Sequence, residues 1–303
     1  MDRYRRLLVA LNLSSLDGTT VSYAAMLSRL AESERVYFVH VAPTLAMPPA
    51  WREKHPELAE IPEDVAVRQM RETVTAHFEG HAGTDLHYES TDGSPVVELL
   101  QRTRRHDIDL VVVGKAVDKR DAGSVPEKLA RKAPCSIMVV RQNSAPKITR
   151  ILLPLDFSEP SAGALEVAAA FARVVGNAPI LPLHAYHVPV GFASVGRTYD
   201  QFADIMREHA EEQYREFLAR ANLEGLELHP AFVPDELPSN AIDKAVQSRG
   251  ADLVIMGARG RSDAAAILLG SATERVVRRA KVPVLVVRRK GEGMGVLDAL
   301  LSW

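Results

Sequence analysis

Short runs of mostly apolar residues mark the predicted strands, at positions 7–11, 36–41, 110–113 and 137–140. None of these runs alternates between apolar and polar side chains. A strand with one face in water alternates, whereas a parallel strand covered by helices on both faces does not. Two segments further along the chain have helical composition, residues 162–175 and 208–221. The pattern therefore predicts an α/β fold with a parallel sheet between two layers of helices.

The pattern occurs twice along the chain. The segment that begins at Leu7 resembles the one that begins at Ile151, 144 residues later. Asp109 and Asp252 begin a second pair of similar segments, 143 residues apart, and residues 137–141 and 284–288 form a third pair, 147 residues apart. The second copy thus carries four additional residues. They fall between its glycine markers, where a functional loop is predicted below.

Each copy has about 140 residues, which is enough for a hydrophobic core of its own. We therefore predict two tandem doubly wound, Rossmann-like domains, residues 1–144 and 148–290, each with a five-stranded, mostly parallel sheet flanked by helices. Ligands of such folds bind outside the carboxyl ends of the strands. Residues 291–303 form a C-terminal tail, either a flexible tether with a short apolar turn or a disordered end.

Composition narrows the choice of partners. The 303 residues carry a net charge of −2, so no basic surplus favours binding to nucleic acid phosphates. A single cysteine, Cys135, excludes an internal disulfide framework and fits a buried apolar position. No apolar run approaches the roughly 18 residues needed to span a bilayer. These features predict a cytoplasmic protein without nucleic acid or membrane partners.

A glycine pattern in the second copy is the main candidate for a binding site. An apolar run at residues 252–256 is followed by Gly257, Gly260, Gly270 and Ser271. Glycine allows close approach of the backbone to a phosphate, and a helix start offers free N–H groups to an anion. The alternative is a capping box between Ser271 and Glu274, which needs no ligand. The spacing alone leaves both interpretations open.

The sequence around these glycines resembles a known family. The four positions fit the G-x2-G-x9-G-[S/T] motif of ATP-binding universal stress proteins, and residues 255–260 and 267–274 resemble that family throughout. The resemblance extends over residues 148–290 and includes the opening segment 153–159. It implies a stress-response regulator that binds one ATP, with Mg²⁺, in its second domain.

The resemblance also implies which residues contact ATP. Asp156 and Ala185 would border the adenine and ribose, while Gly270 and Ser271 would hold the phosphates. Arg259 and its neighbour in the same loop, Arg261, would be phosphate donors, or else solvated loop residues. The full set implied for the ATP site is Pro154, Asp156, Ala185, Met256, Gly257, Arg259, Gly260, Gly270, Ser271 and Thr273.

The first copy departs from the motif. Val117 stands at the position of the second glycine, the loop is four residues shorter, and Asn12 replaces the aspartate of the opening segment. We therefore predict that the first domain does not bind ATP in the manner of the family. Ser124 still begins a helix there. A weak residual anion site remains an alternative, with the candidate residues Lys115, Lys119, Gly123 and Ser124.

Other chemistry finds little support. His184 and His187 lie three residues apart near the end of a strand, where their side chains point to opposite faces, so we expect no metal site there. No G-x-S-x-G motif occurs, and no catalytic residue is assigned. Three alternatives to the regulator stay open: a slow ATPase that uses Arg259 and Ser271, an interaction scaffold with an empty site, and an AMP-responsive protein. Pairing through the last strands, within the chain or in a homodimer, and unidentified protein partners are also expected.

Overall fold

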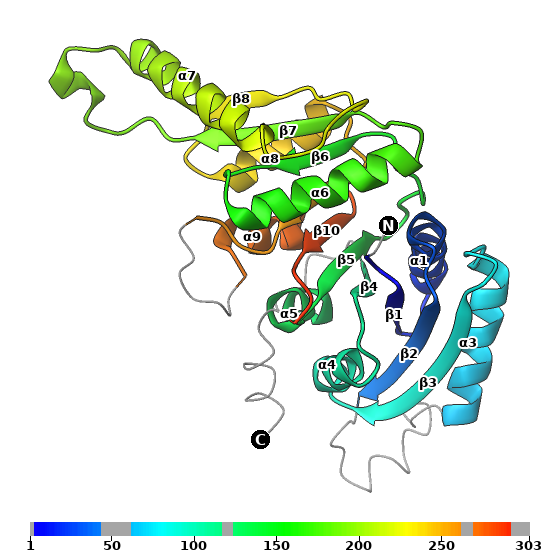
Figure 1. Cartoon of the computed structure of the whole chain (residues 1–303). Coiled ribbons are helices and arrows are strands. Elements are labelled where there is room, and N and C mark those ends of the chain that lie inside the picture. Colours follow the sequence, from blue (N-terminus) through cyan, green and yellow to red (C-terminus); the bar gives the residue numbers. More distant parts are fainter. Residues whose placement is uncertain (1–2, 44–61, 117–123, 262–268, 292–303) are drawn as a thin grey trace, which may run out of the picture. The chain divides into compact units, whose positions relative to one another are not determined.

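The computed structural model describes residues 3–43, 62–116, 124–261 and 269–291 (Figure 1). The chain divides into two compact units, with the main boundary between Pro146 and Lys147. Each unit is an α/β domain with a parallel sheet, so the predicted tandem of Rossmann-like domains is confirmed. The tail residues 292–303 and the loop residues 117–123, on which several predictions rest, lie outside the described part of the chain.

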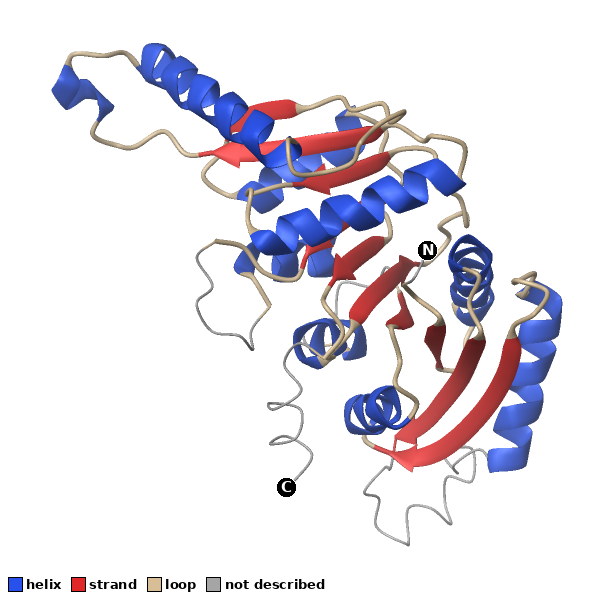
Figure 2. Ribbon diagram, viewed as in Figure 1, coloured by secondary structure: helices blue, strands red, loops and turns tan. Residues whose placement is uncertain are grey.

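The first domain alternates strands and helices along its whole length. Its elements are β1 (Arg6–Leu11), α1 (Asp17–Ala31), β2 (Arg35–Pro43), α3 (Glu63–His77), β3 (Asp85–Gly93), α4 (Pro95–Arg105), β4 (Leu110–Lys115), α5 (Val125–Lys132) and β5 (Ser136–Arg141). The strand order is β3-β2-β1-β4-β5, and the strands pair in parallel. Helices cover both faces of the sheet, α1 and α3 on one side and α4 and α5 on the other (Figure 2).

The second domain repeats this topology. Its elements are β6 (Ile151–Pro154), α6 (Glu159–Val174), β7 (Ile180–Tyr186), the 3-10 helix η2 (Phe192–Val195), α7 (Tyr199–Leu218), β8 (Ala231–Pro234), α8 (Pro238–Ser248), β9 (Leu253–Gly257), α9 (Ser271–Arg279) and β10 (Val284–Val287). The order is β8-β7-β6-β9-β10, again with parallel pairing. The strand order reverses direction between β6 and β9, which is where such folds place a ligand.

The central strands of each sheet are buried. This is why they could be recognised in the sequence as apolar runs. Every residue of β5, β9 and β10 is buried, and so is nearly all of β2. Within the described residues, no helix is long and apolar enough to cross a membrane. Cys135 is buried and not in a disulfide, as the general tendency of free cysteines to be buried predicted.

Two helices differ from their predicted bounds. Helix α6 begins at Glu159 rather than at position 162, because Ser158 caps it by accepting a hydrogen bond from the backbone N–H of Ser161. Helix α7 begins at Tyr199, well before the expected position 208. Its start is a capping box between Thr198 and Gln201, a signal that the helical pattern of residues 208–221 did not include.

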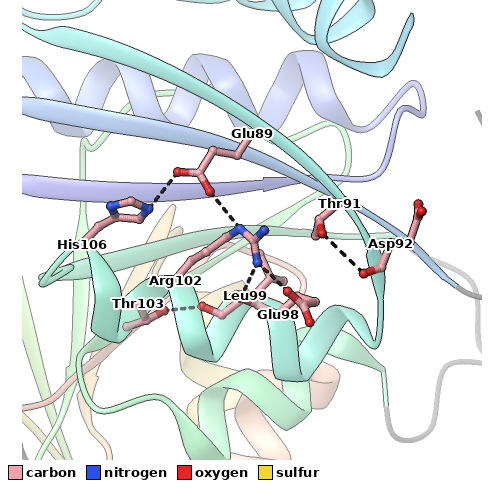
Figure 3. A network of polar contacts seen from close by, with 8 residues as sticks. All are labelled: Glu89, Thr91, Asp92, Glu98, Leu99, Arg102, Thr103 and His106. Carbon is pink, nitrogen blue, oxygen red and sulfur yellow. Dashed lines mark hydrogen bonds and ion pairs between the residues drawn. The ribbon is translucent and has the colours of Figure 1, made fainter. Parts of the chain in front are cut away.

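The edge strand β3 is held by polar contacts rather than by a hydrophobic face. Glu89 on β3 accepts a hydrogen bond from Nε of Arg102 at 2.9 Å, and its other oxygen lies 2.7 Å from Nε2 of His106 (Figure 3). Arg102 also donates to Glu98 one turn earlier on α4, at 2.7 Å. The ring of His106 stacks on Tyr37 of β2, with centroids 4.1 Å apart. A charged network of this kind joins β3, α4 and β2 without an apolar run.

The turn after the first strand of each domain contains a residue in the left-handed conformation. Leu13 has φ +57° and Phe157 has φ +62°, and the two positions correspond in the repeat. L-residues other than glycine, asparagine and aspartate visit this region rarely, at a cost of roughly 1–2 kcal/mol. The turn is therefore a shared structural feature of both copies.

Candidate functional site

A cavity of about 470 Å³ lies at the carboxyl ends of β6, β7 and β9 in the second domain. Its position is the reversal of strand order described above. The lining includes all ten residues that the sequence implied for a nucleotide site, namely Pro154, Asp156, Ala185, Met256, Gly257, Arg259, Gly260, Gly270, Ser271 and Thr273. The fold thus brings together residues that lie as far as 119 positions apart in the chain.

Asp156 is the most highly connected side chain of the cavity. Its Oδ1 accepts hydrogen bonds from the hydroxyls of Ser158 at 2.5 Å and Ser161 at 2.6 Å, and its Oδ2 accepts one from the backbone N–H of Arg261 at 2.7 Å. Burial disfavours the charged carboxylate, but these hydrogen bonds outweigh it and hold the pKa of Asp156 below its usual value. Asp156 is therefore a fixed anion that ties the start of α6 to the glycine loop.

Two of the motif glycines are required by contacts inside the protein. A Cβ atom at Gly260 would lie 2.5 Å from Oδ2 of Asp156, and one at Gly257 would lie 2.9 Å from backbone atoms of Pro160. Both separations are shorter than van der Waals contact permits. Neither glycine has a positive φ, so close approach rather than left-handed geometry explains both. Glycine at these positions lets the loop lie against β6 and α6.

Helix α9 begins without a side-chain cap. Its N-cap residue is Gly270, and the side chain of Ser271 makes no capping hydrogen bond, so the capping box expected as an alternative is not formed. The first intrahelical bond runs from the N–H of Glu274 to the carbonyl of Gly270 at 2.8 Å. The N–H groups of residues 271–273 precede that bond, and an anion in the cavity would find them free of intrahelical partners.

Thr273 lines the cavity and also makes a hydrogen bond inside the protein. Its side chain is buried, 3% exposed, and its hydroxyl donates a hydrogen bond to the carbonyl of Gly257 at 3.0 Å. The donor proton is therefore already committed, and Thr273 holds α9 to the end of β9. Ser271, two residues earlier, is exposed.

The two loop arginines are placed differently. Arg259 and Arg261 both line the cavity. The guanidinium of Arg261 lies over the ring of Phe157, 5.6 Å from its centroid, and both of its terminal nitrogens lie 3.4 Å from the side-chain oxygen of Gln213 on α7. Arg261 is thereby anchored at the cavity rim, and its backbone N–H is the group that Asp156 binds.

One wall of the cavity was not anticipated from the sequence. It is formed by the loop before α8 and by the first turns of that helix, and consists of Glu236, Leu237, Pro238, Ser239 and Ile242. Arg275 of α9 lines the opposite side. Pro95 and Pro238 lie at equivalent positions of the repeat, 143 residues apart, and this pair marks the helix start. In a parallel sheet every strand is followed by its helix at the same edge. Applied to the sequence, this rule would have placed the start of α8 beside the cavity.

The histidines near the site are structural. Nδ1 of His184 lies 2.8 Å from the carbonyl oxygen of Leu155, and in the first domain Nδ1 of His40 lies 3.1 Å from that of Leu11. Each ring thus joins the ends of neighbouring strands. Desolvation lowers the pKa of His184, which favours the neutral ring. Among the residues described, no group of histidine, cysteine and carboxylate side chains is arranged to hold a metal ion.

The first domain has a cavity of about 510 Å³ at the corresponding strand ends. Its charges are paired internally. Lys115, 5% exposed, forms an ion pair with the buried Glu127, and Asp17 accepts hydrogen bonds from the N–H groups of Asn12 and Leu13. The residual anion site considered from the sequence would need Lys115, which is already neutralised. A further candidate, Ser124, lines this cavity, and its Oγ has no hydrogen-bond partner among the described residues. Lys119 and Gly123, the remaining candidates, lie outside the residues that the structure covers.

Comparison with known proteins gives a consistent assignment. The family model described as "Universal stress protein family" matches residues 3–141 and 147–288. The chain is 30% identical over 156 residues to universal stress protein MJ0577 of Methanocaldococcus jannaschii, which covers 46% of this chain and 95% of that protein. It is 27% identical over 234 residues to universal stress protein Rv2005c of Mycobacterium tuberculosis, covering 74% and 75% of the two chains.

Solved structures match over nearly the whole chain. A universal stress protein from Archaeoglobus fulgidus has a TM-score of 0.61 at 20% identity, with 94% of this chain and 96% of that chain covered. A putative universal stress protein from Pseudomonas aeruginosa has a TM-score of 0.66 at 17% identity, covering 99% and 98%. At these identities the matches establish the tandem fold.

Proposed function

The chain belongs to the universal stress protein family, and we propose from this premise that its second domain binds one ATP as the ligand of a stress-response regulator. The observation that carries the proposal is the convergence of all ten implied residues on one cavity of about 470 Å³. A volume of this size is typical of small-molecule sites. The lining of that cavity includes Arg259, Ser271 and Arg275 from the glycine loop and the first turns of α9.

The loop and helix supply what a polyphosphate requires. The uncapped N-terminus of α9 offers N–H groups and the positive end of the helix dipole. Beside it stand the hydroxyl of Ser271 and the cationic Arg259 and Arg275. Guanidinium groups bind phosphate oxygens with paired hydrogen bonds. These features favour a triphosphate over a neutral ligand.

Mg²⁺ would enter with the nucleotide. This ion is usually held by phosphate oxygens, waters and one or two carboxylates. Both oxygens of Asp156 already accept hydrogen bonds, so the carboxylate left in the lining is Glu236, which is exposed. Glu236 belongs to the wall before α8, so phosphate oxygens and waters would carry the ion, and its role would be to neutralise the triphosphate.

A regulatory role suits the site better than rapid hydrolysis. A general base for water attack needs an accessible lone pair and a pKa near the working pH. Asp156 is fully hydrogen-bonded, and its pKa is lowered from an already acidic value. It is a structural anion. Homodimerisation through a last strand and cytoplasmic location stay predictions, and light scattering on the purified chain would test the first.

The test is the nucleotide content of the purified full-length chain. The protein is isolated without added nucleotide, denatured, and its released ligands are quantified by chromatography and mass spectrometry; Kd for ATP with Mg²⁺ is then measured by calorimetry. We expect one ATP per chain and loss of binding in Gly260→Val. The control is Gly163→Ala, because a Cβ at Gly163 meets no atom within 4 Å.

Three results would overturn parts of the proposal. Two ATP molecules per chain would show that the first domain also binds. Equal affinity for AMP and ATP would show that the loop and the start of α9 do not favour a triphosphate. No binding at saturating ATP and Mg²⁺ would leave an interaction scaffold as the function.

A further inference from the structure

An unpaired hydroxyl is buried in the wall of the second-domain cavity. Ser239 lies in the first turn of α8, is 2% exposed and lines the cavity. Its Oγ has no hydrogen-bond partner among the residues that the structure describes. Buried polar side chains are nearly always hydrogen-bonded, and each exception requires an explanation. A ligand in the cavity would supply the missing partner.

Ser239 stands at the apolar end of the cavity. Helix α8 contacts α9, β7 and β6, and Ser239 and Ile242, three positions apart, share one face of this helix. That end of the cavity is lined by Leu183, Ala185, Leu237 and Ile242. In this environment Ser239 is the polar group that makes no bond inside the protein.

The glycine loop lies at the other end. Strand β6 separates β7 from β9, and strands are spaced by about 4.8 Å, so Ala185 and Gly257 are roughly 10 Å apart across the sheet. The cavity therefore has an apolar end at β7 and a phosphate-binding end at the glycine loop that follows β9. A ligand with a flat, mostly apolar ring at one end and an anion at the other matches both.

We propose that Ser239 is a specificity-determining residue whose hydroxyl bonds the polar edge of the nucleobase. This inference rests on the proposed function and refines it. A base that enters the apolar end exposes ring nitrogens and exocyclic groups at its edge, and a serine hydroxyl both donates and accepts. A base without a polar group at that point leaves the Ser239 hydroxyl unpaired and binds more weakly.

The first domain carries a different residue at the position equivalent to Ser239. Counted from the marker Pro95/Pro238, the equivalent of Ser239 is Val96. The first-domain cavity is lined by Pro95 and Leu99 of the same helix, but Val96 does not reach it. The chain therefore offers its own substitution, Ser239→Val, next to the smaller change Ser239→Ala.

The experiment compares three probes on the full chain. Calorimetry measures Kd for Mg-ATP and for adenosine, and competition against ATP measures Kd for inorganic tripolyphosphate, which has no base. We expect Ser239→Ala to weaken ATP and adenosine by the same factor, about 5- to 30-fold, and to leave tripolyphosphate unchanged. The control Ser248→Ala, on the exposed end of the same helix, should leave all three unchanged.

Thermal unfolding separates this role from a structural one. Removing an unpaired buried hydroxyl relieves a cost of folding, so the Tm of ligand-free Ser239→Ala should equal or exceed that of the wild type while its affinity for ATP falls. A Tm well below wild type would mean that the hydroxyl supports the fold.

Two further outcomes overturn the inference in distinguishable ways. Wild-type affinity for ATP in both Ser239→Ala and Ser239→Val would show that the hydroxyl does not contact the base, while the proposed ATP site would stand. Equal weakening of tripolyphosphate would move Ser239 to the phosphate end. Failure of the wild type itself to bind ATP would remove the proposed function and this refinement together.

Discussion

The carboxylate of Asp156 accepts a 2.7 Å hydrogen bond from the backbone N–H of Arg261, 105 positions later in the chain. This single contact fixes the beginning of the glycine loop against the end of the first strand. In the first domain the equivalent residue is Asn12, and the carboxylate stands instead at Asp17, the counterpart of Ser161. The two domains thus place one negative charge at different ends of the same turn.

Moving the carboxylate from position 156 to position 161 should affect the stability of the fold and the affinity for ATP differently. In Asp156→Asn, the side-chain amide faces the N–H groups that the carboxylate accepted, so we expect a loss of about 1–3 kcal/mol in the free energy of unfolding. The double variant Asp156→Asn/Ser161→Asp copies the first domain and should recover much of this stability without recovering ATP affinity. Urea titration and calorimetry measure the two quantities. Full recovery of ATP binding in the double variant would contradict this view of Asp156.

The first motif glycine should be needed even without a ligand. A methyl group at Gly257 would lie 2.9 Å from the backbone of Pro160, so Gly257→Ala should lower the free energy of unfolding by about 1–3 kcal/mol through overpacking. Gly163→Ala, in the open middle of α6, should instead raise it by about 0.5–1 kcal/mol. Both are measured in nucleotide-free protein. Equal effects of the two changes would mean that the close approach at Gly257 relaxes freely.

The buried ion pair of the first domain should be costly to break from one side. Lys115→Met leaves Glu127 charged and buried, and we expect a loss of about 3–5 kcal/mol. Replacing both partners, Lys115→Met/Glu127→Leu, should restore most of that stability, since the buried carboxylate is then removed together with the ammonium group. Chemical denaturation of the single and double variants gives the coupling. A double variant as unstable as the single one would show that Glu127 has a further essential partner.

His184 should make the second domain sensitive to mild acid. Its pKa is lowered in the folded protein by desolvation, so the unfolded chain binds a proton more readily. Stability is therefore complete above the unfolded value of 6.5 and is lost as the pH falls through the folded pKa. In His184→Asn, the Tm should fall less between pH 7 and pH 5 than in wild type. His187→Asn, an exposed neighbour, should behave as wild type.

The sequence predicted the parts of the fold that are buried on both faces. Fully apolar strands such as β9 were recognisable from one pattern. Strand β3 was not, because residues such as Glu89 satisfy their charges through Arg102 and His106 on neighbouring elements. Such pairings depend on tertiary contacts that no local pattern records.

Likewise, only part of the candidate site could be predicted from the sequence. Its glycine end could be located from the resemblance, since the motif residues from Gly257 to Ser271 are close in sequence. The wall that contains Ser239 depends on where α8 packs, and a lone serine after a proline carries no signal of burial. The role of Thr273 also needed coordinates, because its hydroxyl is bound to a carbonyl of another element.

The left-handed conformation of Phe157, although unfavourable for its backbone, positions a side chain that contacts two other elements. Its φ of +62° directs the ring to a position 4.4 Å from the ring of His184 and under the guanidinium of Arg261. The end of β7 and the start of the glycine loop are thereby joined through one side chain. A change in the position of Arg261 would therefore act on the end of β7 through these ring contacts. In the first domain the equivalent residue, Leu13, has no aromatic ring and cannot make these contacts.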